Sequence, residues 1–530
     1  MRSAALLVAF LAGLSAAPVE AREAVEASAP TSLAVTLYRD PDRGADDAMN
    51  RDWPRGFAMI TETRTVTLPP GQSTIRFTGV AEGMVAVSAI VTGLPGGTIE
   101  KNRNADLLSP AALVDGTLGN RVTITRTNPA TGEAMAEEAV VRTRADGGLV
   151  LQTAGGFEAV RCSGLPETLT FDRVPAGLSA QPVFSVETRD PSGGTYTVEL
   201  TYLAWGFDWQ AHYVATLEEL GRDDTVKLRL MSWLTLLNDN GQSFPDAALQ
   251  VVAGRLNVVS DFQGLADPPE ARPLRLTCYP LGSTAAGTPI DYPLPPAPAP
   301  PPPPMAARES IVVTGMRQAD LAAAPAMKAV EEALGDLKLY RVPEPVTVEA
   351  KSLKQVAFLD QEGVEGRLLY TARCTPWDAG PEALPAGMLL ATVNDKQHGL
   401  GMALPMGGVT VFEPTSFGEQ LVAEERVRDY AEGQEVELAL GTSSQVFAHC
   451  ERLSEAGPAA PAPRAEMRLT LSNANRTAAR VRVVLGPAGG GQIRGLPNTR
   501  VKDGEVIVDV AIPANGRREI TWTAGDADDA

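Results

Sequence analysis

Histidines are the first residues to consider for chemistry in this 530-residue chain, because imidazole serves both as a general base and as a metal ligand. The chain has three, His212, His398 and His449. None belongs to an HExxH motif or a closely spaced pair, so the sequence does not predict a zinc site. Asp208 and His212 lie among strand signals, which favours a salt bridge or a solvent-facing pair over catalysis. We therefore predict no metal and no cofactor.

Nucleophilic catalysis has equally little support. The sequence contains no G-x-S-x-G and no S-x-x-K motif, which are common signatures of exported serine hydrolases. His449 adjoins Cys450, but neighbouring strand residues point to opposite faces, so the two side chains would not meet. The glutamate pair at 424 and 425 is explained by a solvated face, because nothing places an acid and a base across a cleft. We predict no catalytic residue and favour a protein that is not an enzyme.

The cysteines carry a different chemistry, because an oxidising compartment favours disulfides. The four are Cys162, Cys278, Cys374 and Cys450, which allow three pairings. We expect a disulfide between Cys374 and Cys450, since both fall in the same predicted domain. Free buried thiols are the alternative, because a chain of this length can build its core without covalent bridges.

The N-terminal segment indicates the compartment. Arg2 precedes an apolar stretch over residues 4–16 and a small-x-small site that ends at Ala21, a pattern typical of a secretory signal peptide. We expect residues 1–21 to be removed and the mature protein to be periplasmic or otherwise exported. No later stretch approaches the ~20 consecutive apolar residues that span a bilayer. The mature chain is therefore predicted to have no transmembrane segment.

The charge of the chain restricts its partners. The formal net charge is -19 at pH 7, whereas nucleic acids and anionic lipid surfaces are bound through Lys and Arg. Nucleic acid is therefore excluded as a predicted partner.

Strand signals dominate the rest of the sequence, since period-two alternation is repeatedly closed by turn residues. Residues 61–68 alternate in this way before PPGQ turns the chain into STIRF. Met467, Leu469 and Leu471 share a face in the same manner. The best helix candidate is residues 325–334, with Gly335 as its C-cap. We predict an all-β, multi-domain protein of tandem β-sandwich or barrel-like modules with little helix.

Two proline-rich tracts, residues 293–304 and 457–463, mark boundaries or excursions. They lead to the following predicted ranges: an N-terminal β region at 30–188, a core at 189–263 and 337–456, a proline-rich excursion at 264–336 that interrupts this core, and a C-terminal immunoglobulin-like sandwich at 464–526.

The core contains a specific resemblance. LTYLAWGFDWQAHYVATL, followed by WLTLLNDNGQSFPDAALQVVAGRLN, resembles the central pattern of bacterial envelope proteins with the domain of unknown function 4139, the mucoidy-inhibitor-A-like group. The resemblance covers most of residues 196–450 and is to a short branch without a coiled coil, since no sustained heptad pattern occurs. It implies a β-rich exported protein and supplies no catalytic residues. The matching positions, which also read naturally as structural residues, are Trp209, Tyr213, Asn238, Gly241, Tyr340, Lys354, Gln355, Asn394, Gly401, Pro405 and Gly407.

The segment ESIVVTGMRQ after the first proline tract resembles the N-terminal region of TonB-dependent receptors, although the chain is too short and irregular for their large barrel. Its tetrad Ile311, Val312, Val313 and Thr314 is β-prone and suited to adding a strand to a partner's sheet edge. We hypothesise that residues 290–318 bind a periplasmic or outer-membrane protein partner. Pairing within the chain, or disorder, is the alternative.

These observations predict an exported cell-envelope protein that acts by binding or scaffolding. An unrecognised hydrolase of envelope polymers is the alternative, and a structural subunit that self-associates through the proline-rich excursion is a third possibility. A cleft with convergent carboxylates or histidines would favour the hydrolase, whereas edge strands and exposed apolar patches without such a cleft would favour the binding protein.

Overall fold

The computed structural model describes residues 23–104, 107–145, 149–160, 167–175, 178–220, 224–258, 260–266, 329–455 and 464–525. Strands account for 63% of these residues and helices for 3%, which confirms the predicted all-β, multi-domain fold. None of the helices in these ranges is long and apolar enough to cross a membrane. The α-helices in these ranges are α1 (Pro110–Gly116) and α2 (Phe262–Ala266).

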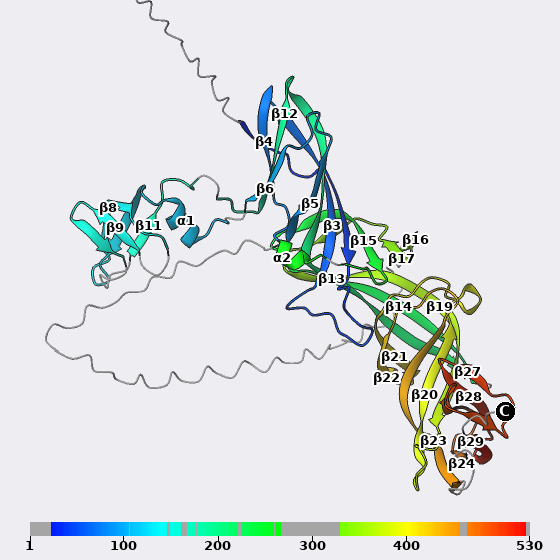
Figure 1. Cartoon of the computed structure of the whole chain (residues 1–530). Helices are drawn as coiled ribbons and strands as arrows, with labels where there is room; N and C mark the ends of the chain where they lie inside the picture. The colour runs from blue at the N-terminus through cyan, green and yellow to red at the C-terminus, as the bar shows by residue number, and fades with distance from the viewer. Residues whose placement is uncertain are drawn as a thin grey trace, which may run out of the picture. The chain divides into compact units, whose positions relative to one another are not determined.

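The chain divides into two compact units, whose strands are labelled in Figure 1. The first draws its described residues from Met1–Leu33, Thr61–Leu203 and Gly264–Ser283, and the second from Ala34–Ile60, Ala204–Gln263 and Thr284–Ala530. Strands β3 (Gly56–Leu68) and β13 (Gly194–Leu220) contribute residues to both units.

The first unit contains a four-stranded sheet in which β4 lies between a parallel and an antiparallel neighbour. The turn expected at PPGQ is present, since β3 ends at Leu68 and β4 begins at Gly71. A further strand of this unit is β5 (Met84–Thr92). In spatial order the sheet consists of β1 (Glu23–Glu26), β4 (Gly71–Thr78), β12 (Val183–Asp190) and β6 (Glu100–Asn104).

A buried charge network crosses the interior of the first unit. The alternation in β3 turns Glu62 and Arg64 toward the buried face. Arg64 Nε lies 2.8 Å from Glu62 Oε2, and the hydroxyl of Tyr202 donates to Glu62 Oε1 at 2.9 Å. Arg64 Nη1 also donates to the carbonyl oxygens of Ser28 and Thr78. Burial of this ion pair is therefore accompanied by hydrogen bonds to both partners.

A second, five-stranded sheet of the first unit has its own small core, which includes Val114, Ile124 and Leu151. Helix α1 begins after Ser109, whose hydroxyl accepts a hydrogen bond from the Ala112 N–H at 3.2 Å, as expected of an N-cap. The strands in spatial order are β10 (Gly156–Ala159), β9 (Val150–Thr153), β8 (Ala134–Val141), β7 (Arg121–Thr127) and β11 (Glu167–Thr170).

Seven strands of the second unit surround an apolar interior. Strand β13 pairs with β14 on one side and in parallel with β21 on the other, and β22 contacts β23. The cavity left between their side chains measures about 30 Å³, whereas a cavity that admits benzene measures about 150 Å³. The interior is thus a packed core. The other six strands are β14 (Thr225–Asn238), β19 (Ser352–Arg373), β20 (Leu384–Val393), β21 (Gly407–Thr415), β22 (Gly418–Val427) and β23 (Glu435–Glu455).

The predicted helix at residues 325–334 is wrong over the part that the structure describes. Val330–Leu334 forms strand β16, which pairs antiparallel with β17 (Leu337–Arg341) across a turn at Gly335. Pairing with β17 gives the β16 backbone its partners, and the Glu331 carboxylate accepts a hydrogen bond from the Ala403 N–H. These tertiary contacts override the local helix signals.

Strand β15 pairs with strands from distant parts of the sequence. It pairs in parallel with β2 and antiparallel with β17 and β18. The bounds of these strands are β2 (Ser32–Tyr38), β15 (Phe244–Ala253) and β18 (Val346–Val348).

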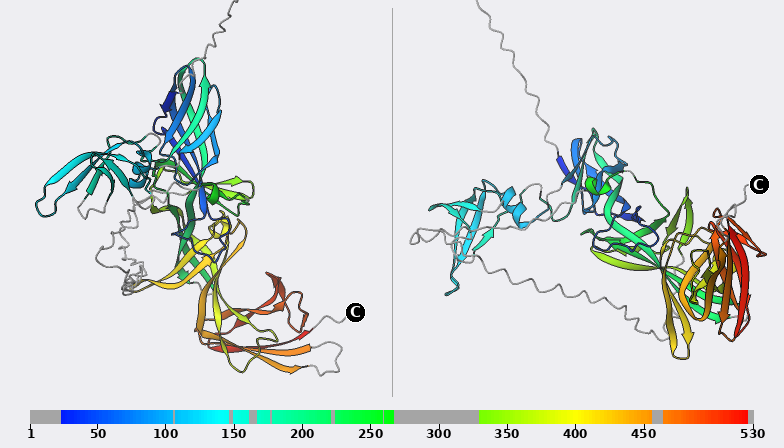
Figure 2. Two further views of the ribbon diagram at one scale, coloured as in Figure 1. Left: turned by 60° about the vertical axis from the view of Figure 1, so that its left-hand side comes forward. Right: turned by 60° about the horizontal axis from the view of Figure 1, so that its bottom comes forward.

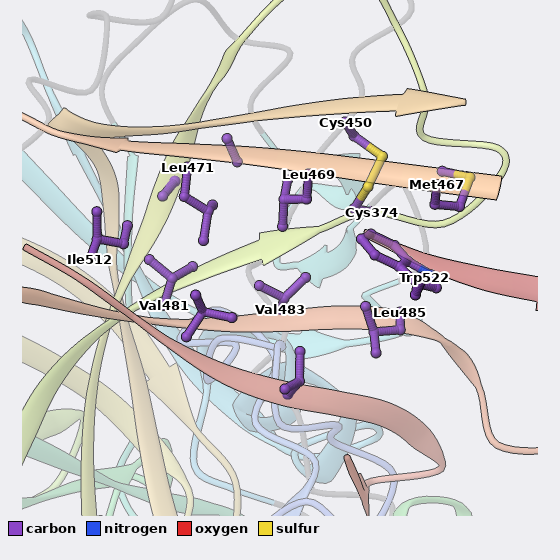
Figure 3. Packing of buried hydrophobic residues seen from close by; sticks show 14 of the residues in the cluster. Cys374, Cys450, Met467, Leu469, Leu471, Val481, Val483, Leu485, Ile512 and Trp522 are labelled. Atoms are coloured by element: carbon purple, nitrogen blue, oxygen red, sulfur yellow. A yellow bond between two sulfur atoms is a disulfide. The ribbon is translucent and has the colours of Figure 1, made fainter. Parts of the chain in front are cut away.

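The C-terminal strands form a sandwich with segments of the preceding core (Figures 1 and 2). The end of β19 pairs with β25, and the second half of β23 pairs with β24. Figure 3 shows their shared apolar core around Leu469, Val483 and Trp522. The strands are β24 (Arg464–Asn473), β25 (Ala479–Pro487), β26 (Gln492–Arg494), β27 (Arg500–Lys502), β28 (Glu505–Ile512) and β29 (Gly516–Gly525).

The predicted disulfide between Cys374 and Cys450 is confirmed, with their Cα atoms 5.4 Å apart. It lies within the sandwich core and joins the residue that follows β19 to β23 (Figure 3).

Candidate functional site

Several of the positions that carry the sequence resemblance lie in, or contact, residues 394–407, the segment between β20 and β21. The hydroxyl of Tyr213 donates to the Pro405 carbonyl at 2.7 Å, and that of Tyr340 donates to the Ala403 carbonyl at 2.7 Å. Burial raises the pKa of both phenols well above its usual range. The two tyrosines therefore remain neutral hydrogen-bond donors that hold this segment in place.

The same segment is held at both ends. Asn394 donates to the carbonyl oxygens of Met402 and Ala431, and its side-chain oxygen accepts from the Gly401 N–H at 3.2 Å. At the other end, a Cβ on Gly407 would lie 1.9 Å from a backbone oxygen of β13. Only glycine fits such an approach of two strands.

An ion pair adds a further support. Asp429 Oδ1 accepts a hydrogen bond from the Met406 N–H and from Arg39 Nη1, both at 2.9 Å. Arg39 is itself buried. Residues 390 positions apart in the chain thus fix one short segment, and their geometry is that of a structural anchor.

The remaining positions that carry the sequence resemblance stabilise turns and strand contacts. Trp209 is buried, and Asn238 donates to the carbonyl oxygens of Gln242 and Glu349 around the turn that contains Gly241. Lys354 Nζ donates to the Thr347 carbonyl oxygen at 2.9 Å. Gln355 Nε2 lies 3.4 Å from the Thr235 hydroxyl.

Asp208 and His212 have separate surroundings. They lie four positions apart on β13, a separation of about 13 Å along a strand. Asp208 Oδ2 lies 2.6 Å from Arg43 Nη1. Burial raises the pKa of Asp208, against the attraction of Arg43. The half-buried His212 has Nε2 3.2 Å from the Thr410 hydroxyl.

The adjacent pair His449 and Cys450 does not form a dyad. Cys450 is bonded to Cys374, whereas His449 Nε2 donates to the Gly380 carbonyl at 3.1 Å. The third histidine makes a local contact, since His398 Nδ1 lies 2.7 Å from Asp395 Oδ1 across the 3-10 turn η1 (Lys396–His398). Within the described ranges, no group of three or more His, Cys, Asp or Glu side chains could hold a metal ion.

A polar cleft of about 580 Å³ lies between the turn that joins β27 to β28 and the residues around the start of β23. Lys502 Nζ hydrogen-bonds to Glu435 and lies 3.4 Å from carboxylate oxygens of Glu437 and Asp503. Partial burial opposes the charged ammonium, but the Glu435 hydrogen bond and the nearby carboxylates raise the pKa of Lys502 overall. The ion pairs across this cleft hold two segments of the same unit together.

The most exposed tryptophan of the described chain is Trp377, at 79%. It lies in residues 374–384, which we name the tryptophan loop. Asp378 accepts hydrogen bonds from the Thr375 N–H at 3.0 Å and from the Thr375 hydroxyl at 2.7 Å. The same hydroxyl accepts from the Trp377 N–H at 3.3 Å. The loop backbone beside Trp377 is therefore ordered by its own side chains.

The tryptophan loop is also fastened to β23. The disulfide joins Cys374 to Cys450, and the Gly380 N–H donates to the Cys450 carbonyl at 2.9 Å. Arg452 Nη2 donates to the Pro376 carbonyl at 3.0 Å. A covalent bond and these hydrogen bonds thus present an exposed indole on a fixed backbone.

Sequence reasoning did not identify Trp377 as a candidate residue. An isolated aromatic residue in a loop has no periodicity, so only the expected Cys374–Cys450 bridge could have drawn attention to it. The predicted partner-binding residues Ile311, Val312, Val313 and Thr314 lie outside the described residues.

Comparison with protein-family models and with curated proteins finds no match to this chain. The resemblance to the domain of unknown function 4139 group therefore stays a prediction.

Proposed function

We propose that this chain is an exported cell-envelope protein of the domain of unknown function 4139 group that acts by binding another protein. The observation that supports this proposal is the tryptophan loop. Its disulfide also suits an oxidising compartment such as the periplasm.

Physical reasoning supports a binding role for Trp377. Tryptophan is enriched among the few residues that dominate protein interfaces, because it buries a large apolar surface and retains one hydrogen-bond donor. An exposed indole on a flexible loop would lose conformational entropy when it binds. The hydrogen bonds and disulfide of the tryptophan loop reduce that cost, because the backbone is already ordered.

The hydrolase alternative would use the polar cleft. Its carboxylates are paired within the protein, since Glu437 lies 2.5 Å from Arg482 Nη1 and Glu435 hydrogen-bonds to Lys502. This pairing favours a structural role for the cleft over acid and base catalysis. We therefore retain the binding function.

The test compares Trp377→Ser with Trp53→Ser, in which the replaced tryptophan is 53% exposed. Each full-length protein is crosslinked in the native envelope, purified, and its adducts identified by mass spectrometry. We expect a specific adduct to be lost from Trp377→Ser and retained by Trp53→Ser. Identical adducts in both variants and the parent protein would contradict the proposal.

Deletion of residues 290–318 in the same experiment tests the predicted tether. Loss of a periplasmic or outer-membrane adduct would assign partner binding to this segment. A change in oligomeric state would instead favour self-association through this segment. If both the adducts and the oligomeric state are unchanged, the segment is a linker.

A further inference from the structure

The hairpin of β21 and β22 extends beyond the strands that support its base. Strand β13 pairs with β21 from Gly407 as far as Phe412, which lies opposite Thr216. Beyond this point β21 and β22 pair with each other through Thr415 and Gly418. We name residues 412–421 the hairpin arm.

The end of the hairpin arm presents apolar side chains. Phe417 is 93% exposed and Leu421 is 62% exposed. The turn that carries Phe417 is ordered, because the Thr415 hydroxyl accepts from the Phe417 N–H at 3.2 Å and donates to the Gly418 carbonyl at 2.8 Å. Gly418 has a φ of 105°, which glycine adopts readily. This turn thus holds a phenyl group away from the folded core.

Acidic residues accompany these apolar groups. Glu413 and Glu419 lie on the two strands close to the tip, where Glu413 pairs with Gln420 and Glu419 with Pro414. Glu424 and Glu425 lie farther from the tip, opposite Thr410 and Val409 at the base of the hairpin. The basic residue of this hairpin, Arg426, donates to the Asp47 carbonyl at 3.0 Å. The arm is therefore an apolar tip with a negative border.

We propose that the hairpin arm inserts Phe417 into an apolar pocket of a partner protein whose rim carries Lys and Arg. Burial of an aromatic side chain supplies affinity, and opposite charges around it speed association and select the partner. An anionic membrane would bury the same side chain but would repel Glu413 and Glu419. Charge complementarity thus favours a basic protein surface.

This inference is independent of the tryptophan loop, because it rests on other residues and names the chemistry of the partner. The two surfaces can be disrupted separately. Loss of one adduct with retention of the other would distinguish failure of this proposal from failure of the proposed function.

The experiment replaces Phe417 with p-benzoylphenylalanine in the full-length protein and irradiates the native envelope. We expect an adduct with a protein whose crosslinked peptide carries net positive charge. In a charge-reversed background, Glu413→Lys with Glu419→Lys, the adduct should fall at least tenfold. Glu344→Lys, an exposed substitution in another turn, should leave its yield unchanged.

Purified variants supply the second measurement. Phe417→Ser should lower affinity for the identified partner at least tenfold, whereas Val501→Ser, at a residue 62% exposed, should not. Phospholipid adducts, no adduct, or an adduct insensitive to charge reversal would overturn the proposal. So would binding of the parent protein, lost in Phe417→Ser, to vesicles of phosphatidylcholine and phosphatidylglycerol.

Discussion

At the residue scale, buried charges in this protein are accompanied by specific hydrogen bonds. Glu62 receives hydrogen bonds from both Arg64 and Tyr202, and the Tyr202 hydroxyl accepts from the Ala81 N–H at 3.2 Å. Period-two alternation predicts which face of β3 is buried. It places Glu62 and Arg64 on one face, but it cannot predict their other hydrogen-bond partners, because Tyr202 and the carbonyls of residues 28 and 78 are brought to them only by folding.

We predict that Arg64→Met lowers the free energy of unfolding by about 3–5 kcal/mol, because it leaves the Glu62 carboxylate buried without its cation. Urea denaturation monitored by circular dichroism measures the change. The double variant Glu62→Leu with Arg64→Met should recover part of the loss, since it removes both charges. A loss below about 1 kcal/mol in the single variant would show that the pair has little role in stability.

We predict that His212 makes the free energy of unfolding depend on pH. Burial lowers the pKa of His212 below 6.5, although Glu424 opposes this shift and Arg426 adds to it. The unfolded chain therefore binds a proton more readily than the folded one. The resulting stability is present above pH 6.5 and is lost as the pH falls from about 7 toward the folded pKa.

The corresponding variant is His212→Gln. Its free energy of unfolding should depend less on pH between 7 and 5 than that of the parent protein, in urea titrations at several pH values. Equal slopes for His212→Gln and the parent protein would rule out this role.

At the element scale, strand alternation was predictable but strand partners were not. Met467, Leu469 and Leu471 share a buried face as their spacing indicates. The residues at 330–334 lack such alternation, and the helix expected there is strand β16 because β17 pairs with it. Local pattern thus identifies an element when one face is buried, whereas an exposed hairpin depends on its tertiary partner.

The contact between β13 and β21 gives a prediction at this scale. Gly407→Ala should lower the free energy of unfolding by about 1–3 kcal/mol, because its Cβ would overlap the Ala211 carbonyl oxygen. Thermal unfolding measures the effect. Gly489→Ala is the control, since a Cβ there meets nothing within 4 Å. Equal melting temperatures for the two variants would show that the strands can move apart without cost.

At the scale of the whole molecule, long-range pairing determines what the sequence leaves open. Strands β14 and β19 pair although more than a hundred residues separate them, and the C-terminal sandwich includes the ends of β19 and β23. Composition and turn signals cannot specify such partners. The cysteines are an exception, because chemistry allows few pairings and one was preferred for lying within a single predicted domain.

The Cys374–Cys450 disulfide therefore has two separable effects. It closes a loop with a sequence separation of 76. The entropy that the unfolded chain loses by this closure stabilises the folded state by about 4 kcal/mol. The variant Cys374→Ser with Cys450→Ser should unfold at a lower urea concentration, with a free energy of unfolding reduced by a similar amount.

The same variant should also weaken partner binding through Trp377 under conditions where the second unit stays folded, because the loop loses its covalent attachment. Hydrogen exchange of residues 374–384 distinguishes the effects: faster exchange without global unfolding indicates loosening of the loop, whereas unchanged exchange and binding would contradict a role for the disulfide in ordering Trp377.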